Sequence, residues 1–233
     1  MDGGSRPPRF VFGRRRGRAL RSGQRASLER LSPLLSVAVP AGGRLDPRSL
    51  FGAAPRPVWL EIGFGGGEHL VWQAQSRPGI GLLGCEIFEN GIARLLSQVD
   101  RCNLANIRIF TDDALLLIEA LPAASIDRVF ILFPDPWPKA RHNKRRLISD
   151  ETLDRLAAIM TRGAELRLAT DDTDYLCWML ERVTRHRAFE WLAQRAADWR
   201  GRPVDWPATR YEEKARNAGR RASFLRFGRR PTA

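Results

Sequence analysis

One aspartate and one tryptophan stand directly ahead of a cationic run near the middle of the sequence. Residues 133–146 read Phe-Pro-Asp-Pro-Trp-Pro-Lys-Ala-Arg-His-Asn-Lys-Arg-Arg, so that Asp135 and Trp137 precede five lysine and arginine side chains. The apolar run 126–133 is typical of a buried strand, which places Asp135 at the carboxyl end of a strand, where open α/β sheets bind ligands. A carboxylate and an indole beside a cationic track suit a nucleobase that is attached to a polyanion.

A second chemical pattern is a glycine loop between a predicted strand and a predicted helix. Residues 63–67 read Gly-Phe-Gly-Gly-Gly, which permits a tight turn and the close approach of a ligand to the backbone. A dinucleotide fingerprint needs glycine where this chain has Glu68, whose carboxylate would face a pyrophosphate at a helix N-terminus. The loop therefore disfavours a nicotinamide-dependent dehydrogenase. With Glu61 two residues ahead, its Gly-x-Gly-x-Gly pattern resembles that of S-adenosylmethionine-dependent methyltransferases, whose cofactor is cationic and has no phosphate.

Acidic residues recur at the ends of the predicted strands around this loop. Glu61 precedes the loop, and Glu86 follows Gly63 by 23 residues, the spacing at which an acid accepts hydrogen bonds from ribose hydroxyls. Asp113 follows the next strand, where it could receive an adenine amino group, although the adjacent Asp112 leaves this choice open by one residue. Alone, Glu86 is equally a solvated strand end and Asp113 equally a helix cap. In register with the glycine loop, the three acids indicate one cofactor site.

The elements that must position these residues alternate along the chain. Apolar runs predict strands at 58–62, 80–85, 107–110, 126–133 and 165–169, and 3.6-residue periodicity predicts helices at 68–75, 90–101, 114–121, 149–161 and 172–186. Weaker patterns predict two last strands at 189–192 and 223–227. Strands that alternate with helices imply right-handed crossovers and a mostly parallel sheet.

The charge of the 233-residue chain is concentrated in three segments. The net charge is +13, and the excess of lysine and arginine lies in residues 1–30, 139–146 and 207–233, whereas the rest of the chain is net acidic. Such clustering is expected for a nucleic-acid ligand, whose affinity depends on counterion release. A uniformly basic surface is the alternative, and the acidic remainder argues against it.

Composition also bounds the domain organisation and the compartment. Residues 1–25 are rich in arginine and poor in apolar side chains, so we expect a disordered basic arm, followed by a single domain over residues 26–233. An organelle transit peptide remains an alternative for the arm. Three isolated cysteines build neither a disulfide framework nor a zinc site, and no apolar stretch approaches the roughly 20 residues that span a bilayer. We therefore expect a cytoplasmic protein without a metal or a membrane partner.

The segment 133–146 resembles the signature of the bacterial tRNA (guanine-N7-)-methyltransferase family. Ala169-Thr170-Asp171, with Tyr175 four residues later, and residues 209–212 resemble later motifs of that family, so the resemblance covers about residues 14–228. It implies a Rossmann-like, S-adenosylmethionine-dependent methyltransferase with a seven-stranded, mostly parallel sheet and helices on both faces. The implied substrate is a guanosine in the variable loop of tRNA. The chain departs from the pattern only in the arm before Arg14 and in Gly66, which makes the loop unusually glycine-rich.

The resemblance implies roles for three groups of residues. The implied cofactor contacts are Glu61, Gly63, Gly65, Glu86, Asp113 and Asp135. The implied contacts with the substrate guanosine are Lys139, Asp171, Thr209, Arg210, Tyr211 and Glu212. The implied contacts with the rest of the tRNA are Arg141, His142, Asn143, Lys144, Arg145 and Arg146.

The chemistry of guanine agrees with these residue types. N7 carries an in-plane lone pair and no proton, so its methylation needs placement rather than a general base. A fixed carboxylate, Asp135 or Asp171, would favour the movement of positive charge onto the purine, and we assign Asp135 as the catalytic residue. A carboxylate also accepts the N1 and N2 hydrogens of guanine. Trp137 is equally a base platform or a packing residue, and His142 is more consistent with a phosphate or packing contact than with acid–base chemistry.

Two other readings remain open from the sequence. The first is a methyltransferase for another substrate, such as ribosomal RNA or a small acidic metabolite. The second is a non-catalytic RNA-binding protein, which would fail to bind S-adenosylmethionine. The oligomeric state, monomer or homodimer, is also left open.

Overall fold

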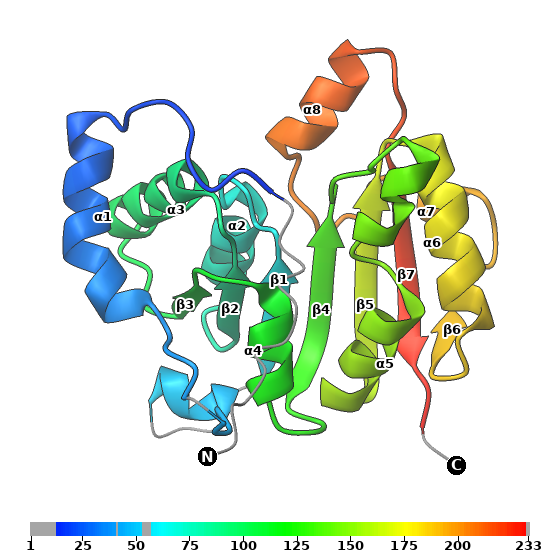
Figure 1. Ribbon diagram of the computed structural model, residues 1–233, viewed down its shortest axis with the longest axis horizontal. Helices are drawn as coiled ribbons and strands as arrows, with labels where there is room; N and C mark the ends of the chain where they lie inside the picture. The colour runs from blue at the N-terminus through cyan, green and yellow to red at the C-terminus, as the bar shows by residue number, and fades with distance from the viewer. Residues whose placement is uncertain (1–12, 41, 53–56, 232–233) are drawn as a thin grey trace.

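One sheet of seven strands forms the centre of the part of the protein that the computed structural model describes, residues 13–40, 42–52 and 57–231 (Figure 1). The strand order is β3-β2-β1-β4-β5-β7-β6. The strands are β1 (Val58–Ile62), β2 (Gly81–Cys85), β3 (Ile107–Phe110), β4 (Ile126–Leu132), β5 (Met160–Thr170), β6 (Phe189–Trp191) and β7 (Ser223–Arg229). Neighbours from β3 to β5 pair in parallel, and β7 alone runs antiparallel to its neighbours β5 and β6. The predicted seven-stranded, mostly parallel sheet is confirmed.

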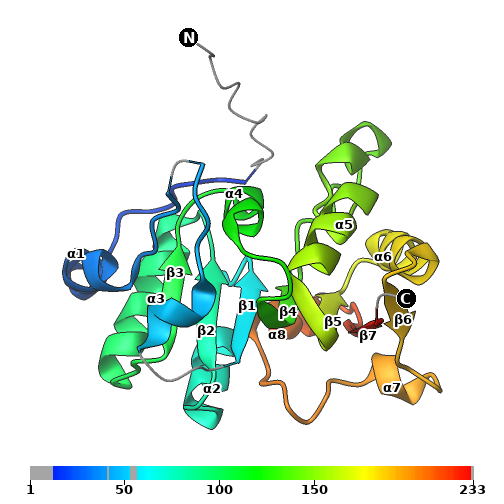
Figure 2. The same cartoon turned by 90° about the horizontal axis from the view of Figure 1, so that it is seen from below.

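Helices cover both faces of this sheet, as predicted (Figure 2). The α-helices are α1 (Ser22–Leu35), α2 (Glu68–Ser76), α3 (Glu89–Arg101), α4 (Ala114–Ala120), α5 (Asp150–Ile159), α6 (Thr173–Arg185), α7 (Ala197–Arg200) and α8 (Arg210–Asn217). Two 3₁₀ helices are η1 (Pro47–Phe51) and η2 (Ala140–Arg145). Apolar side chains of α1, α2 and α3 pack on one face, and those of α4, α5 and α6 pack on the other. The two cores hold the strand ends in fixed positions.

The local sequence explains most of these elements. All five residues of β1 are buried, as expected for a strand of a parallel sheet that is covered on both faces. In α3 the predicted apolar face is confirmed, because Ile92, Leu95, Leu96 and Val99 are buried. Ser149 caps α5 as predicted, since its hydroxyl accepts a hydrogen bond from the backbone N–H of Thr152 at 3.2 Å.

The structure differs from the prediction at several boundaries. The helix predicted at 149–161 ends at Ile159, because residues from Met160 onward already pair with β4 or extend β5. The basic arm was placed at residues 1–25, of which 1–12 lie outside the described residues. Residues 13–21 run beside the start of α3, and α1 begins at Ser22. The connection between β6 and β7 contains two helices that the sequence analysis did not predict, α7 and α8.

Two further features concern the helices and the cysteines of the described residues. None of the described helices combines the length and the apolar character that crossing a membrane requires. The three cysteines Cys85, Cys102 and Cys177 are free thiols. Cys85 is buried, and burial, together with the nearby carboxylates of Glu86 and Asp113, raises the pKa of its thiol well above the usual value.

Candidate active site

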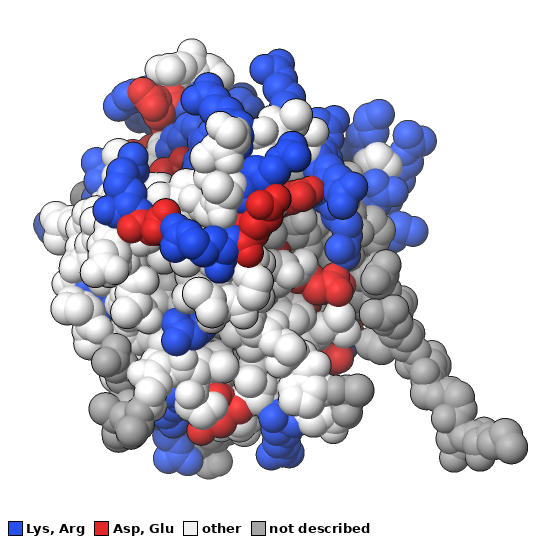
Figure 3. All heavy atoms as spheres, turned by 90° about the vertical axis from the view of Figure 1, so that its left-hand side faces the viewer, with Lys and Arg blue, Asp and Glu red and all other residues white. Residues whose placement is uncertain are grey.

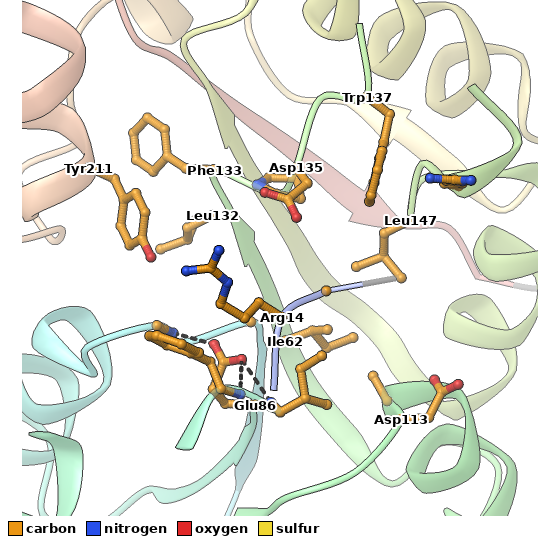
Figure 4. Close-up of a pocket in the computed structure, with 18 residues that line it drawn as sticks. Arg14, Ile62, Glu86, Asp113, Leu132, Phe133, Asp135, Trp137, Leu147 and Tyr211 are labelled. Atoms are coloured by element: carbon orange, nitrogen blue, oxygen red, sulfur yellow. Dashed lines mark hydrogen bonds between the residues drawn. The ribbon is translucent and has the colours of Figure 1, made fainter. Parts of the chain in front are cut away.

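A cavity of about 440 Å³ opens at the carboxyl ends of the parallel strands (Figure 4). Ile62 at the end of β1, Glu86 after β2 and Leu132 at the end of β4 contribute to its wall. Along the sheet, β2 and β3 lie on one side of β1 and β4 lies on the other. The cavity therefore lies where the strand order reverses, which is the usual ligand-binding position in open α/β sheets.

The glycine loop forms one side of the cavity. Gly63, Gly65 and Gly67 adopt φ angles of 76°, 55° and 78°, a region that L side chains rarely occupy. A Cβ on Gly91 in α3 would lie 2.2 Å from the carbonyl oxygen of Gly65, so the helix backbone packs directly against the loop. The Gln98 side chain donates a hydrogen bond of 2.8 Å to the carbonyl of residue 66. Conformation and packing together fix this loop before any ligand binds.

Glu86 ties the glycine loop to the segment that follows β2. Its carboxylate accepts hydrogen bonds from the backbone N–H groups of Gly65, Ile87 and Phe88, at 2.8, 2.7 and 3.0 Å (Figure 4). Burial raises the pKa of Glu86 above its usual value, although the three N–H donors oppose this shift. Two of the donors use one carboxylate oxygen, so the other keeps a lone pair for a ligand hydroxyl in the cavity.

Glu61 does not line the cavity. It is buried in β1, and its carboxylate accepts a hydrogen bond of 2.7 Å from Nδ1 of His69. Nε2 of His69 accepts from the Gln73 amide at 3.0 Å, which places the imidazole proton on Nδ1. The same amide donates to the carbonyl of Asp205 at 3.0 Å. Glu61 thus begins a buried chain of hydrogen bonds that leads away from the cavity to the segment before α8.

The two aspartates after β3 have different partners. Asp113 lines the cavity and caps α4, where its carboxylate accepts from the backbone N–H of Leu115 at 3.0 Å. Asp112 forms an ion pair of 2.7 Å with Arg15 of the N-terminal segment. The neighbouring Arg14, which the sequence analysis did not single out, reaches into the cavity (Figure 4).

The loop after β4 carries the predicted catalytic residue. The Asp135 side chain is exposed and lines the cavity (Figure 4), and it forms no hydrogen bond or ion pair with the described residues. Phe133 and Trp137 flank it with φ angles of 52° and 46°, so the proline-rich loop turns sharply on both sides of the carboxylate. The Arg145 guanidinium lies 4.9 Å from the centre of the Trp137 ring, which also lines the cavity.

Of the residues predicted to contact the guanosine, Tyr211 alone lines the cavity. Its ring lies 6.3 Å from that of Phe133 with an interplanar angle of 15°, and it would collide with a Cβ on Gly65. Thr209 caps α8 by accepting a hydrogen bond from the backbone N–H of Glu212 at 3.3 Å. The other predicted members lie outside the cavity wall: Lys139, Asp171, Thr209, Arg210 and Glu212.

Two of these outer residues form ion pairs. Asp171, after β5, lies 2.8 Å from Arg220 through its Oδ2. Glu212 in α8 lies 3.2 Å from Arg202. Lys139 and Arg210 are exposed. Asp171 and Asp135 follow the adjacent strands β5 and β4, so both carboxylates belong to the same edge of the sheet.

The six residues predicted to contact tRNA are in different environments. Arg141 and Lys144 are exposed on η2, His142, Asn143 and Arg145 are half-buried, and Arg146 is buried. Arg145 lines the cavity. The pKa of His142 is lowered by desolvation and by the neighbouring charges of Arg145, Lys139 and Lys144. His142 is therefore neutral at physiological pH.

The cationic side chains gather on one edge of the protein. Figure 3 shows lysine and arginine concentrated along the upper edge of the face that carries α1 and α3, the edge toward which β4 and β5 point in Figure 1. Exposed basic residues occur in residues 14–18, η2 and α8, and each of these segments also contributes a residue to the cavity wall, Arg14, Arg145 and Tyr211. The cavity wall itself holds both charges, the carboxylates of Glu86, Asp113 and Asp135 and the guanidinium groups of Arg14 and Arg145.

The cavity fits a cationic nucleoside cofactor. Its volume lies within the range of small-molecule sites, about 300–1,000 Å³. A Cβ on Gly63 would meet nothing within 4 Å, so the loop leaves open space beside the backbone. The carboxylates of Glu86, Asp113 and Asp135 suit hydroxyl and amino donors and a positive charge, and Ile87 and Leu147 offer apolar surface for a purine. Among the described residues no cluster of His, Cys, Asp or Glu is arranged to hold a metal ion.

Solved structures support the fold. A precorrin-6y C5,15-methyltransferase from Geobacter metallireducens aligns with a TM-score of 0.51 at 14% identity and covers 79% of this chain and 86% of its own. An rRNA methylase from Streptococcus thermophilus aligns with a TM-score of 0.50 at 12% identity and covers 76% and 88%. At such low identity the similarity establishes the Rossmann-like methyltransferase fold and no more.

Sequence comparisons establish the family. A family model described as a putative methyltransferase matches residues 55–225. A tRNA (guanine-N(7)-)-methyltransferase of Rhodospirillum rubrum is 49% identical over 228 residues, which cover 95% of this chain and 88% of the relative. The corresponding protein of Paramagnetospirillum magneticum is 52% identical over 225 residues, which cover 96% and 93%. Because this similarity extends over nearly the whole chain, the protein belongs to the tRNA (guanine-N(7)-)-methyltransferase family.

Proposed function

We propose that the protein transfers a methyl group from S-adenosylmethionine to N7 of a guanosine in the variable loop of tRNA, in the cytoplasm. The observation that carries this proposal is the position of Asp135, which lies in a cavity lined by carboxylates and on the loop that leads directly into the cationic helix η2. The names of the relatives support the choice of tRNA and of guanine N7. The cavity beside Asp135 would hold the nucleobase, and the adjacent cations of η2 would bind the phosphates of the same RNA.

The cofactor-holding residues come from four strand ends. Gly63 and Gly65 would offer backbone, Glu86 would accept ribose hydroxyls, and Asp113 would receive the adenine amino group. Asp135 would face the reacting end. Glu61 would act on this site only through β1 and its hydrogen bond to His69. When bound, S-adenosylmethionine supplies an electrophilic methyl group on a positively charged sulfur.

The protein contributes placement and charge to the reaction. Guanine N7 has a lone pair and no proton, so no side chain has to act as a general base. Correct alignment of the reactants contributes up to about 7–11 kcal/mol in well-oriented intramolecular reactions. As the purine gains positive charge, the Asp135 carboxylate stabilises that charge. It can do so because no cation among the described residues forms an ion pair with Asp135 and neutralises its negative charge.

Recognition of the guanosine is assigned to the residues around the cavity mouth. Oδ2 of Asp171 pairs with Arg220, which leaves Oδ1 to accept a guanine hydrogen. Tyr211, with Lys139, Thr209, Arg210 and Glu212 around it, would contact the nucleoside from α8 and η2. The exposed Arg141 and Lys144 and the partly exposed Arg145 would bind phosphates, and these contacts would give a salt-dependent affinity.

Labelled S-adenosylmethionine and unmodified tRNA provide the direct test. After incubation with the protein and digestion to nucleosides, the label should appear as 7-methylguanosine, and mapping should place it in the variable loop. Label in another nucleoside, or in ribosomal RNA alone, would reject the proposed substrate. If the protein bound tRNA but not S-adenosylhomocysteine, it would instead be a non-catalytic RNA-binding protein.

A further inference from the structure

Arg146 lies inside the protein, although it ends a run of exposed cations. Only 1% of its side chain is exposed. Nε donates a hydrogen bond of 2.8 Å to the carbonyl of Pro136, and the terminal Nη2 forms an ion pair with Asp174. The flat guanidinium lies 5.0 and 4.8 Å from the ring centres of Tyr175 and Trp178. A side chain in this position cannot reach a phosphate of bound RNA.

The partners of Arg146 come from a loop and from the start of a helix at the same edge of the sheet. Pro136 follows Asp135 in the loop after β4, and Asp174 lies in the first turn of α6, three residues after Asp171. Two more hydrogen bonds join the same regions: the backbone N–H of Ile148 donates to the Tyr175 hydroxyl at 3.2 Å, and Nε1 of Trp178 donates to the carbonyl of Ile148 at 2.7 Å. Arg146 therefore connects the loop that carries Asp135 to α6, the helix that follows Asp171.

Arginine has the geometry that this connection requires. Its fork places separate N–H donors on Pro136 and Asp174 at once, while its planar face covers Tyr175 and Trp178. In lysine a single nitrogen would have to serve both acceptors, and the planar face would be lost. Burial of a guanidinium is costly unless its hydrogen bonds are satisfied. The protein meets that condition here, and this argues for a role beyond filling space.

We propose that Arg146 is a positioning residue of methyl transfer, which holds the Asp135 loop at a fixed distance from Asp171 and α6. This inference rests on the proposed function. Arg146 does not line the cavity, and its buried side chain is not among the exposed cations of η2. Its effect on methyl transfer therefore passes through the hydrogen bond to Pro136 and so to the neighbouring Asp135. It therefore acts on the rate of the chemical step, whereas the exposed cations of η2 act on RNA affinity.

The test compares Arg146→Lys with Lys144→Ala, a variant of an exposed cation two residues away. Arg146→Lys should lower kcat by about 10²-fold, as a displacement of about 1 Å at a reacting group does, with KM for tRNA within about threefold of wild type. Its slope of log affinity against log salt should equal that of wild type. Lys144→Ala should show the opposite pattern, with a higher KM and a salt slope reduced by about 1. Thermal unfolding of each variant provides the folding control.

Asp174 offers a second pair of variants at the exposed end of the same ion pair. Its side chain is 70% exposed, so Asp174→Ala should fold, and it should lower kcat by about 10-fold with the salt slope unchanged. Asp174→Glu keeps the carboxylate and should restore kcat to within about threefold of wild type. If Arg146→Lys does not fold, the Asp174 pair decides the question.

Any one of three outcomes would overturn the inference. These are a kcat for Arg146→Lys within about threefold of wild type, a salt slope reduced as in Lys144→Ala, and no loss of kcat in Asp174→Ala. If wild type transfers no methyl group to guanine N7, the proposed function fails instead. Amide hydrogen exchange at Phe133, Asp135 and Trp137, which should speed up in Arg146→Lys without any substrate, then decides whether Arg146 holds the loop.

Discussion

Glu86 combines two tasks at the level of a single residue. Its carboxylate fixes the glycine loop through three backbone N–H groups and also lines the cavity. A carboxylate that accepts several N–H bonds usually has a lowered pKa, but here burial dominates and the pKa of Glu86 is raised. Burial therefore makes the ionised form of Glu86 less stable than it would be in water. Ribose hydroxyls that donate hydrogen bonds to the carboxylate would reduce this free-energy cost.

The pH dependence of stability provides a test of this assignment. Because the folded-state pKa of Glu86 is above the usual 4.5, its contribution to stability is complete below pH 4.5 and is lost as the pH rises through the raised value. The free energy of unfolding of wild type, measured by urea titration relative to Glu86→Gln, should therefore decrease from pH 4.5 toward neutrality. A difference that stays flat or increases over this interval would contradict the assignment.

Asp135 is the residue on which turnover should depend most. Asp135→Ala should abolish methyl transfer, and Asp135→Asn, which keeps the shape and removes the charge, should lower the single-turnover rate by at least about 10²-fold. The affinity for tRNA, measured by filter binding, should remain close to that of wild type, because Asp135 contributes no positive charge. Unchanged turnover in either variant would reject the catalytic role.

The sequence predicted the acids that line the cavity but not the buried partners of Glu61 and Arg146. Glu86, Asp113 and Asp135 follow strands, and their position at one sheet edge could be inferred from the alternation of strands and helices. Glu61 and Arg146 have equally suggestive positions in the sequence. Their hydrogen bonds to His69 and Pro136 depend on how helices pack on the sheet, which spacing along the chain does not specify.

At the level of elements, α3 supports the proposed cofactor site through its backbone. Gly91 lies in the first turn of α3 and allows the helix to contact the carbonyl oxygen of Gly65. The sequence held a signal for this contact, since a glycine inside a helical pattern often marks a close approach. Gly91 has no side chain that could bind a ligand, so the sequence analysis did not single it out.

Gly91→Ala should therefore damage the loop more than the helix. The added Cβ would lie 2.2 Å from the oxygen of Gly65, so the loop must move, and affinity for S-adenosylhomocysteine by calorimetry should fall at least about 10-fold. Gly23→Ala in α1 is the matched control, because nothing lies within 4 Å of its Cβ. The control should gain about 0.4–1 kcal/mol of stability and keep its affinity. Equal affinity in both variants would show that α3 does not support the loop.

Of the α-helices that the sequence analysis did not predict, α1 and α8 escaped prediction for different physical reasons. Helix α1 contains Pro33 and follows an arginine-rich segment, and it is held by packing of Leu28, Leu31 and Leu35 against the core under α3. Helix α8 buries Ala215 alone, so it shows almost no apolar periodicity. Intrinsic preference is weak evidence in both cases, and tertiary contacts determine the outcome.

At the level of the whole molecule, Asp205 links the sheet to the segment that carries Tyr211. Its carboxylate lies 2.7 Å from the buried guanidinium of Arg167, and its carbonyl accepts from Gln73. Burial alone would raise the pKa of Asp205, but the hydrogen bond and the charge of Arg167 lower it overall. The adjacent Trp206 is buried against His69, Phe130 and Phe224. The buried contacts of Asp205 and Trp206 thus connect the segment before α8, which carries Tyr211, to α2 and to the strands β4, β5 and β7.

Asp205→Ala should reveal the strength of this link. Loss of a charged hydrogen bond to Arg167, whose side chain is 3% exposed, should cost about 1.5–3 kcal/mol in the free energy of unfolding. Glu181→Ala removes surface ion pairs with Arg182 and Arg185 and should cost less than about 1 kcal/mol. Urea unfolding of both variants compares the two values. A similar small cost for both would mean that Asp205 is not an anchor.

The position of β7 has a consequence for how the protein is made. This last strand lies between β5 and β6 and supplies the fully buried Leu225 and Phe227. A ribosome must therefore release residues 223–229 before the sheet can close, and until then β5 and β6 lack the strand that pairs with both of them. A product of premature termination keeps every residue of the glycine loop and of η2 but lacks this strand. Proteases should remove such fragments before they compete for RNA.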